Sequence, residues 1–406
     1  MANGRDTATP PPAPLDPSAL ERVIAPFGES VTLPAGAYTS SEVFAWEYEH
    51  IFGAGWMCAG RTEELLKPGQ VRAISLGNEA VLLTRSGDEL RAFSNTCRHR
   101  GHELAPVGEA VDARLIRCPY HSWSYRLDGD LNSAPTLTQS EGFDRDDYPL
   151  IPVATEIWNG FMFLDLSGSA GPLAAHAGNL TDLLADYELG GLVEVARHEY
   201  DVAANWKTIV ENYNECYHCS SIHPELCEVT PPESGVDIQP TGLWCGGTMD
   251  LKPPATTMSL DGVSHSSSFP CLTADQLRKV LYVTMFPNLL LSAHPDYLLT
   301  HRLTPTAPDR TRVECTWLFA AEAVARARFD PAYAVDFWDI TNRQDWAACE
   351  SVNRGLHNRG YRPGPLSSWE GTVYQWLGML ARAYLGMGFT VPTVPDCVAN
   401  DQAPLG

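Results

Sequence analysis

Short apolar runs bounded by turn residues predict two sets of β-strands in this chain. In the first set the bounding residues are mainly Gly and Asp, and the runs cover residues 71–75, 80–84, 90–95 and 160–166. In the second set the intervening turns are rich in Pro, Asn and Asp, and the runs cover residues 281–285, 289–293, 297–303 and 311–319. We therefore predict a small antiparallel β domain followed by a larger domain that contains an antiparallel meander.

A helical spacing of apolar residues marks segments on both sides of the second set of strands. Such residues recur every three or four positions at Trp206, Ile209, Val210 and Tyr213, and again at Trp346, Cys349, Val352 and Leu356. A further helical segment is predicted over residues 40–52. The fold class is therefore α+β.

The composition narrows the class of protein without identifying it. A chain of 406 residues with 44% hydrophobic and 19% charged residues is long enough for two globular domains. Its net charge of −22 argues against a nucleic-acid partner, which would need a basic surface. No run of eighteen apolar residues is present, so we expect no membrane partner.

Two Cys–His pairs form the first chemical motif: Cys97 and His99, then, after eighteen residues, Cys118 and His121. Two thiolates and two imidazoles can hold a [2Fe–2S] cluster, with the cysteines on one iron and the histidines on the other. A structural zinc site is the alternative, but zinc sites usually pair like ligands locally, whereas each pair here is mixed. His102 is a further candidate ligand, and we expect it beside the others or at the surface.

A second motif contains two acidic residues and two histidines. Glu211, Glu215 and His218 are spaced by four and three residues, so in a helix they share one face. Pro224 ends the regular pattern and leaves His223 near a helix end, from where it can turn back toward His218. Two imidazoles and one carboxylate from elsewhere form the facial triad of mononuclear Fe(II) oxygenases. The alternative is that both histidines are ordinary polar residues.

Together the motifs resemble those of Rieske non-haem iron oxygenases, specifically the large catalytic (alpha) subunit, over about residues 40–390. The gap between the Cys–His pairs is slightly longer than is usual in that family. The resemblance implies a Rieske [2Fe–2S] domain over residues 44–165 and a helix-grip catalytic domain that binds mononuclear Fe(II) over residues 166–406. An N-terminal arm over residues 1–39 would precede them, and we expect residues 4–16, polar and then Pro-rich, to be disordered.

The resemblance also points to the third iron ligand. Asp345 lies near the first turns of a predicted helix that resembles the family's C-terminal helix, whose Asp completes the triad. Glu350 is an alternative in the same helix, although we expect it to pair with Arg354 four residues on. Asp336 and Asp339, a short way upstream, are the other candidates.

A head-to-tail homotrimer is a further implication, with the cluster of one subunit facing the iron of its neighbour. Glu215 matches the position that bridges the cluster ligand His121 to an iron ligand, and such carboxylates fix imidazole orientation. Glu211 either supports this network or is a solvated helix charge. No Gly-rich nucleotide-binding loop follows a predicted strand, so a separate NAD(P)H-dependent reductase or ferredoxin has to supply electrons.

Eleven cysteines, of which two are explained as ligands, indicate a reducing compartment rather than a disulfide framework. Since no apolar leader-like segment is present, we expect a cytoplasmic protein. Cys216, Cys219 and Cys227 crowd the second motif, and we interpret them as small packing residues.

The predicted function is oxidation of a small organic substrate with O2. Glu at position 215, where the family often has Asp, resembles the branch that acts on N-methylated and quaternary ammonium compounds, which favours monooxygenation with N-demethylation. Aromatic residues expected near the pocket would suit such a cation; they are Trp244, Phe286, Tyr361, Trp369, Tyr374 and Trp376. The alternatives are an aromatic-ring or aliphatic C–H hydroxylase and, in a different class, a Rieske electron carrier or redox sensor without oxygenase activity.

Overall fold

A computed structural model describes residues 9–137 and 141–395, which form two compact units. The first unit contains residues 48–173, and the second contains residues 9–47 together with 174–395. Both units contain antiparallel sheets, and the long helices belong to the second. The predicted α+β class is therefore confirmed.

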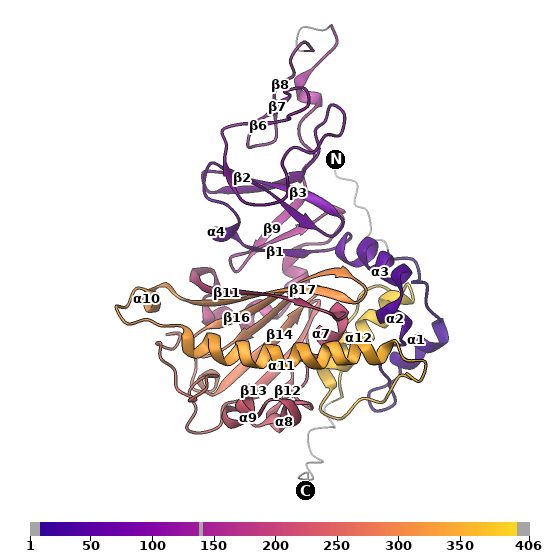
Figure 1. The fold of residues 1–406 in the computed structure, drawn as a ribbon, viewed down its shortest axis with the longest axis vertical. Helices are drawn as coiled ribbons and strands as arrows, with labels where there is room; N and C mark the ends of the chain where they lie inside the picture. Colours follow the sequence, from indigo (N-terminus) through magenta and orange to yellow (C-terminus); the bar gives the residue numbers. More distant parts are fainter. Residues whose placement is uncertain (1–8, 138–140, 396–406) are drawn as a thin grey trace. The chain divides into compact units, whose positions relative to one another are not determined.

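Antiparallel strands make up most of the first unit (Figure 1). One three-stranded sheet has the order β1 (Met57–Arg61), β10 (Phe161–Asp165), β9 (Ala154–Trp158). The four-stranded sheet has the order β4 (Glu89–Ser94), β3 (Glu79–Ser86), β2 (Gln70–Leu76), β5 (Val111–Asp112). A second three-stranded sheet has the order β6 (Ile116–Arg117), β7 (Ser124–Tyr125), β8 (Leu131–Ser133). The helical segments include a π-helical turn (Tyr48–Phe52), α4 (Thr62–Leu65) and a 3-10 turn (Arg145–Asp147).

A turn after β7 shows why one glycine is needed in this unit. Gly129 has a φ of +95°, and a Cβ at this position would lie 2.5 Å from the Phe93 ring. Its amide donates to the carbonyl of Arg126 at 3.1 Å, and its carbonyl accepts from the amide of Leu150 at 2.8 Å. Glycine is therefore required both by the backbone conformation and by the close packing of the aromatic ring.

A seven-stranded antiparallel sheet forms the framework of the described part of the second unit (Figure 1). Its order is β11 (Leu192–Val202), β17 (Arg310–Ala320), β16 (Leu298–Ala307), β15 (Leu289–Ala293), β14 (Lys279–Met285), β13 (Trp244–Asp250), β12 (Val236–Asp237). Strands β14 to β17 are the predicted meander, each somewhat longer than or equal to its predicted run. The sequence did not indicate β11, β12 or β13. In β11 most side chains are only partly buried and several are charged, so its apolar signal is weak.

Helices pack around this sheet. They are α1 (Pro17–Val23), α2 (Gly36–Thr39), α3 (Ser41–Glu47), α5 (Leu173–Ala177), α6 (Leu180–Leu183), α7 (Trp206–Tyr213), α8 (Cys219–Ile222), α9 (Pro224–Val229), α10 (Ala321–Val324), α11 (Ala332–Leu356) and α12 (Gly371–Tyr384). Helix α11 runs for 25 residues along the sheet (Figure 1). It begins well before the predicted segment, so Asp345 lies in mid-helix and not near its first turns. Within the described residues, no helix combines the length and apolar character needed to cross a membrane.

The N-terminal segment differs from the predicted separate arm. Residues 1–8 lie outside the described residues, but residues 9–39 belong to the second unit. The amide of Ala13 donates to the carbonyl of Tyr384 at 2.8 Å, and the carbonyl of Pro11 accepts from Trp46 Nε1 at 3.0 Å. Leu20 is 1% exposed. The Pro-rich stretch is therefore ordered by backbone hydrogen bonds and apolar contacts that composition alone does not reveal.

A buried ion pair joins helix α3 to helix α7 in the second unit. Lys207 Nζ lies 2.6 Å from Glu47 Oε1, and both side chains are fully buried. Trp206 Nε1 donates to the other carboxylate oxygen of Glu47 at 2.8 Å, and the Tyr384 hydroxyl also donates to this carboxylate. Burial lowers the pKa of Lys207, and Glu47 opposes this shift. Each buried charge is thus stabilised by the opposite charge on its partner.

We expect Glu47→Gln to destabilise the second unit by about 3–5 kcal/mol, because it leaves the Lys207 ammonium buried without a counter-charge. The double variant Glu47→Leu/Lys207→Met should lose much less stability, since it removes both charges. Denaturant unfolding followed by circular dichroism measures the difference, with Glu42→Gln on the exposed side of α3 as the control. Equal losses in the single and double variants would contradict this account.

Candidate cluster and metal sites

Two loops with matching geometry bring the predicted cluster ligands together in the first unit. In each loop the cysteine amide donates to the carbonyl five residues on: Cys97 to His102, and Cys118 to Trp123, both at 2.8 Å. In each loop the cysteine carbonyl accepts from the amide four residues on, which belongs to Gly101 or Ser122. These two residues adopt left-handed φ values of +73° and +62°. The repeated turn presents each Cys–His pair in the same way.

The donor atoms in these loops suit a [2Fe–2S] cluster. Cys97 and Cys118 are each 2% exposed, whereas His99 is half-buried and His121 is exposed. The centroids of the two imidazole rings are 4.7 Å apart. Sulfur donors on the buried side and imidazole donors on the exposed side match the mixed ligation of a Rieske cluster. His102 is exposed, and its Nδ1 lies 2.5 Å from the Glu103 carbonyl oxygen.

A tyrosine supports the first of these loops. The Tyr125 hydroxyl lies 3.4 Å from Cys97 Sγ and accepts a hydrogen bond from the Arg98 amide at 3.0 Å. A hydroxyl that donates to a cluster thiolate stabilises the more negative, reduced state. We therefore expect Tyr125→Phe to lower the reduction potential by tens of millivolts while the cluster stays bound, as measured by redox titration of its visible spectrum. An unchanged potential would show that the hydroxyl does not donate to the sulfur.

Three short helices position the two histidines of the second motif. Helix α7 begins after Asn205, whose side chain accepts a hydrogen bond from the Lys207 amide at 3.0 Å and caps the helix. It ends at Tyr213, so the acidic–histidine segment continues as a turn and not as the predicted single helix. His218 lies at the start of α8 and His223 at its end, where Pro224 begins α9. The two imidazoles can therefore face each other across one helical turn.

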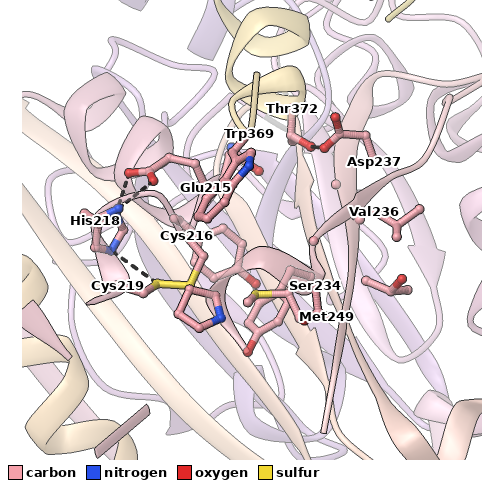
Figure 2. A pocket seen from close by; sticks show the side chains of 18 of the residues that line it. Glu215, Cys216, His218, Cys219, Ser234, Val236, Asp237, Met249, Trp369 and Thr372 are labelled. Carbon is pink, nitrogen blue, oxygen red and sulfur yellow. Dashed lines mark hydrogen bonds and ion pairs between the residues drawn. A yellow bond between two sulfur atoms is a disulfide. The ribbon is translucent and has the colours of Figure 1, made fainter. Parts of the chain in front are cut away.

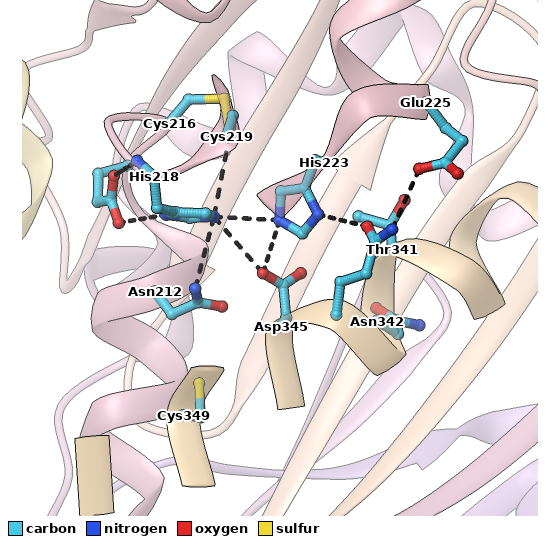
Figure 3. Close-up of polar contacts among 12 residues, drawn as sticks. Asn212, Cys216, His218, Cys219, His223, Glu225, Thr341, Asn342, Asp345 and Cys349 are labelled. Atoms are coloured by element: carbon cyan, nitrogen blue, oxygen red, sulfur yellow. Dashed lines mark hydrogen bonds and ion pairs between the residues drawn. A yellow bond between two sulfur atoms is a disulfide. The ribbon is translucent and has the colours of Figure 1, made fainter. Parts of the chain in front are cut away.

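These histidines and Asp345 from α11 converge (Figure 3). His223 Nε2 lies 2.9 Å from Asp345 Oδ1 and 3.2 Å from His218 Nε2, and His218 Nε2 lies 3.5 Å from Asp345 Oδ1. One donor atom from each residue lies within 4.8 Å of the donor atoms of the other two, which is close enough for all three to bind one ion. Two nitrogens and one carboxylate oxygen match the facial set used for non-haem Fe(II).

The electrostatics of this group favour a bound cation. Burial lowers the pKa of His218, but Asp345 and Glu215 outweigh that effect and raise it to about 9. Burial raises the pKa of Asp345, but hydrogen bonds with His218 and His223 bring it below the usual value. The carboxylates thus create a negative potential at the imidazoles, which a divalent ion would neutralise.

Two further residues that the sequence did not single out orient His223. Gln344 Oε1 lies 2.7 Å from His223 Nδ1, and Gln344 Nε2 donates to Glu225 Oε2 at 3.1 Å. Gln344 is therefore held with its oxygen toward the imidazole, which fixes Nδ1 as the protonated nitrogen and leaves Nε2 free for a metal. Gln344 precedes Asp345 in α11, so its proximity to His223 depends on packing across 121 residues of sequence.

The predicted acidic residues have different surroundings. Glu215 contacts His218 Nδ1 through one carboxylate oxygen, and the other accepts the amide hydrogen bonds of Tyr217 at 2.5 Å and His218 at 3.1 Å. Glu211 accepts a hydrogen bond from the Tyr38 hydroxyl at 2.8 Å, and burial raises its pKa to about 8. Glu211 is therefore not the solvated helix charge that was considered as an alternative.

The other candidate carboxylates lie apart from this group. Glu350 accepts a hydrogen bond from the Ala203 amide at 3.2 Å, and among the described ion pairs there is none with Arg354, contrary to the predicted pairing. Asp339 contacts Tyr200 and Arg343, at 2.7 and 2.8 Å, in a separate groove. Asp336 is exposed. Asp345 is the one carboxylate of these four that the structure places with the histidines.

A disulfide joins Cys216 to Cys219, so the interpretation of these two residues as packing thiols was wrong. The bond closes the turn that carries His218 and directly follows Glu215 (Figure 2). Two residues between the cysteines allow such a bond, but the spacing alone does not distinguish it from free thiols. Cys227 is a free, half-buried cysteine.

A cavity of about 560 Å³ opens beside the triad. It is lined by aromatic rings and carboxylates, and none of the described lining residues is Lys or Arg. The aromatic members are Phe27, Tyr213, Tyr282, Trp338 and Trp369. Of the six aromatic residues predicted near the pocket, Trp369 alone is among the described lining residues; Trp244 and Trp376 are fully buried in the core.

The fold and both sites define a class, and comparison with known proteins agrees. Residues 55–152 match the family model of the Rieske [2Fe–2S] domain, and residues 189–386 match that of the ring-hydroxylating alpha subunit (catalytic domain). The chain belongs to the Rieske non-haem iron oxygenase family, so it is an oxidoreductase with a [2Fe–2S] cluster and mononuclear iron as cofactors. The alternative of a Rieske electron carrier without an oxygenase domain is thereby set aside.

Relatives within the family share most of their length with this chain. The carnitine monooxygenase oxygenase subunit of Escherichia coli K12 is 38% identical over 348 residues, which cover 82% of this chain and 86% of the relative. The glycine betaine monooxygenase oxygenase subunit of Chromohalobacter salexigens is 30% identical over 366 residues, which cover 83% of this chain and 82% of the relative. A solved quaternary ammonium Rieske monooxygenase superposes with a TM-score of 0.76 at 25% identity, covering 92% of this chain and all of the other.

Proposed function

We propose that this protein is the oxygenase component of a monooxygenase that oxidises a small N-methylated or quaternary ammonium cation. The observation that carries the proposal is the cavity beside the triad, in which aromatic rings accompany carboxylates and no described Lys or Arg. Aromatic faces and carboxylates both attract a quaternary ammonium group. The similarity to carnitine and glycine betaine monooxygenase oxygenase subunits supports the same class of substrate.

We assign the metal and cluster ligands as follows. His218, His223 and Asp345 would hold the mononuclear iron, and the cluster would be held by Cys97, His99, Cys118 and His121. When bound, the cluster supplies single electrons and the iron activates O2. Three protein ligands would leave the iron able to bind further groups, and the adjoining cavity would supply the space for substrate and O2.

The chain's own side chains would then orient these groups. Glu215 holds the His218 imidazole through Nδ1, and Gln344 holds His223 in the same way. The aromatic walls of the cavity would bind the ammonium group and exclude water from around it. Glu211 in α7, which accepts a hydrogen bond from Tyr38 of α2, would help to keep the turn that carries Glu215 in place.

Assembly and electron supply complete the proposal. A head-to-tail homotrimer would bring His121 of one subunit to Glu215 of the next, and Glu215 would bridge the cluster ligand to the iron ligand. A separate NAD(P)H-dependent reductase or ferredoxin would donate electrons. A cytoplasmic location stays a prediction from the sequence.

A single-turnover experiment tests this function. Chemically reduced, iron-loaded protein is mixed with O2 and one compound from a panel of carnitine, glycine betaine, choline and aromatic acids, and products are identified by mass spectrometry. We expect formaldehyde or a hydroxylated product from a trimethylammonium compound. Products from the aromatic acids alone would favour the ring or C–H hydroxylase and overturn the cation proposal.

A further inference from the structure

The disulfide next to the proposed iron ligands has no part in the function described so far. Cys216 and Cys219 flank Tyr217 and His218, with Cys216 in the turn after α7 and Cys219 at the start of α8, and both line the cavity (Figure 2). Their side chains are 9% and 3% exposed, so the cavity is their route to solvent. A Cys-x-x-Cys pair at such a position can exchange between a disulfide and two thiols.

One of the two sulfurs lies within reach of a metal held by the triad. Cys219 Sγ is 4.0 Å from His218 Nε2, the nitrogen that faces His223 and Asp345 (Figure 3). A nitrogen and a sulfur bound to one ion at about 2.0 and 2.3 Å lie about 3.0–3.5 Å apart when the angle between the two bonds is about 90–110°. Cys219 Sγ would therefore have to move by less than about 1 Å to bind the same ion, and rotation of its side chain allows this once the disulfide is broken.

The oxidation state of the pair decides whether this sulfur can act as a ligand. A disulfide sulfur carries no charge and binds metals weakly, whereas a thiolate is a strong soft ligand for first-row metals. No comparable contact with a triad nitrogen is found for Cys216 Sγ among the described residues. Cys219 is thus the candidate ligand, and Cys216 is the partner that masks it.

We propose that Cys219 is a latent fourth protein ligand of the metal site, masked by its disulfide with Cys216. In the oxidised form the site has two imidazoles and one carboxylate, with positions open for substrate and O2. A dithiol that enters the cavity would donate two electrons and two protons, break the Cys216–Cys219 bond and become a disulfide itself. The Cys219 thiol would then lose its proton on binding the metal and fill an open position. This inference rests on the proposed triad.

Co(II)-loaded protein gives a readout that does not depend on activity, because a thiolate bound to Co(II) adds a strong near-ultraviolet charge-transfer band. Spectra of wild type are recorded after treatment with a dithiol and after treatment with the thiol oxidant diamide. We expect the band after dithiol treatment and its loss after diamide treatment. In Cys216→Ser, which leaves Cys219 unmasked, the band should be present after both treatments, and in Cys219→Ser it should be absent after both. Because all variants keep the cluster, difference spectra remove its contribution.

Two further measurements separate the possible failures. Co(II) binding that is stoichiometric in wild type and lost in His218→Ala supports the triad, and its absence would overturn the proposed metal site itself. If Co(II) binds but Cys216→Ser lacks the band, the triad stands and Cys219 is not a ligand. Alkylation followed by peptide mass spectrometry should show the Cys216–Cys219 bond in diamide-treated protein, and free thiols there would overturn the masking.

Discussion

His218→Ala is expected to abolish turnover and bound mononuclear iron while leaving the visible spectrum of the cluster intact. Its Nε2 is one of the three donor atoms that converge within 4.8 Å, and two remaining ligands would bind a divalent ion far more weakly. The proposed cluster ligands lie in the first unit, in loops held by their own backbone hydrogen bonds. The change should therefore remove the mononuclear iron and leave the [2Fe–2S] cluster in place. Metal analysis measures the bound mononuclear iron, the visible spectrum measures the cluster, and product formation measures turnover.

A matched control distinguishes loss of a ligand from loss of any imidazole. His265 belongs to the same unit, is exposed and pairs with Asp261 at 2.9 Å, away from the triad. His265→Ala should retain the mononuclear iron, the [2Fe–2S] cluster and full turnover. Loss of the cluster spectrum in His218→Ala would contradict the assignment of the two centres to separate parts of the chain. Retention of stoichiometric mononuclear iron would remove His218 from the ligand set.

The parts of the fold that the sequence predicted are those with strong local signals. The meander strands carry long apolar runs with clear turns, and α7 has a capping Asn205 and buried residues at helical spacing. The proposed cluster-ligand motifs are likewise compact, since each Cys–His pair occupies one loop. In contrast, the N-terminal half of α11 was not predicted, although its buried residues Ala334, Phe337 and Trp338 also recur at helical spacing.

The features that were missed depend on packing between distant segments. Gln344 faces His223 because α11 packs against the helices that follow α7, and nothing in its neighbouring residues marks it. The Pro-rich residues near Pro11 are ordered by a hydrogen bond from Trp46 and by α12. The Cys216–Cys219 disulfide was also missed, because two intervening residues are compatible with a disulfide and with two free thiols alike.

Glu215→Gln is expected to lower the single-turnover rate about 10–100-fold while the cluster spectrum stays unchanged. Both carboxylate oxygens of Glu215 accept hydrogen bonds: one from His218 Nδ1 and the other from the Tyr217 and His218 amides. An amide has one acceptor oxygen, so Gln has to give up either the imidazole or the backbone amides. It also removes the negative charge that raises the pKa of His218. Either loss would disturb the orientation and basicity of the proposed iron ligand.

The measurement that separates two roles of Glu215 is the rate of cluster reoxidation alongside the affinity for iron. If Glu215 bridges the two centres between subunits, the reoxidation rate falls even in protein that is fully loaded with iron. If it serves solely to orient His218, iron affinity falls and the rate recovers at saturating iron. Glu228→Gln, an exposed substitution in the same segment, should change neither quantity. A normal rate at full iron loading in Glu215→Gln would therefore reject the bridging role while leaving the triad in place.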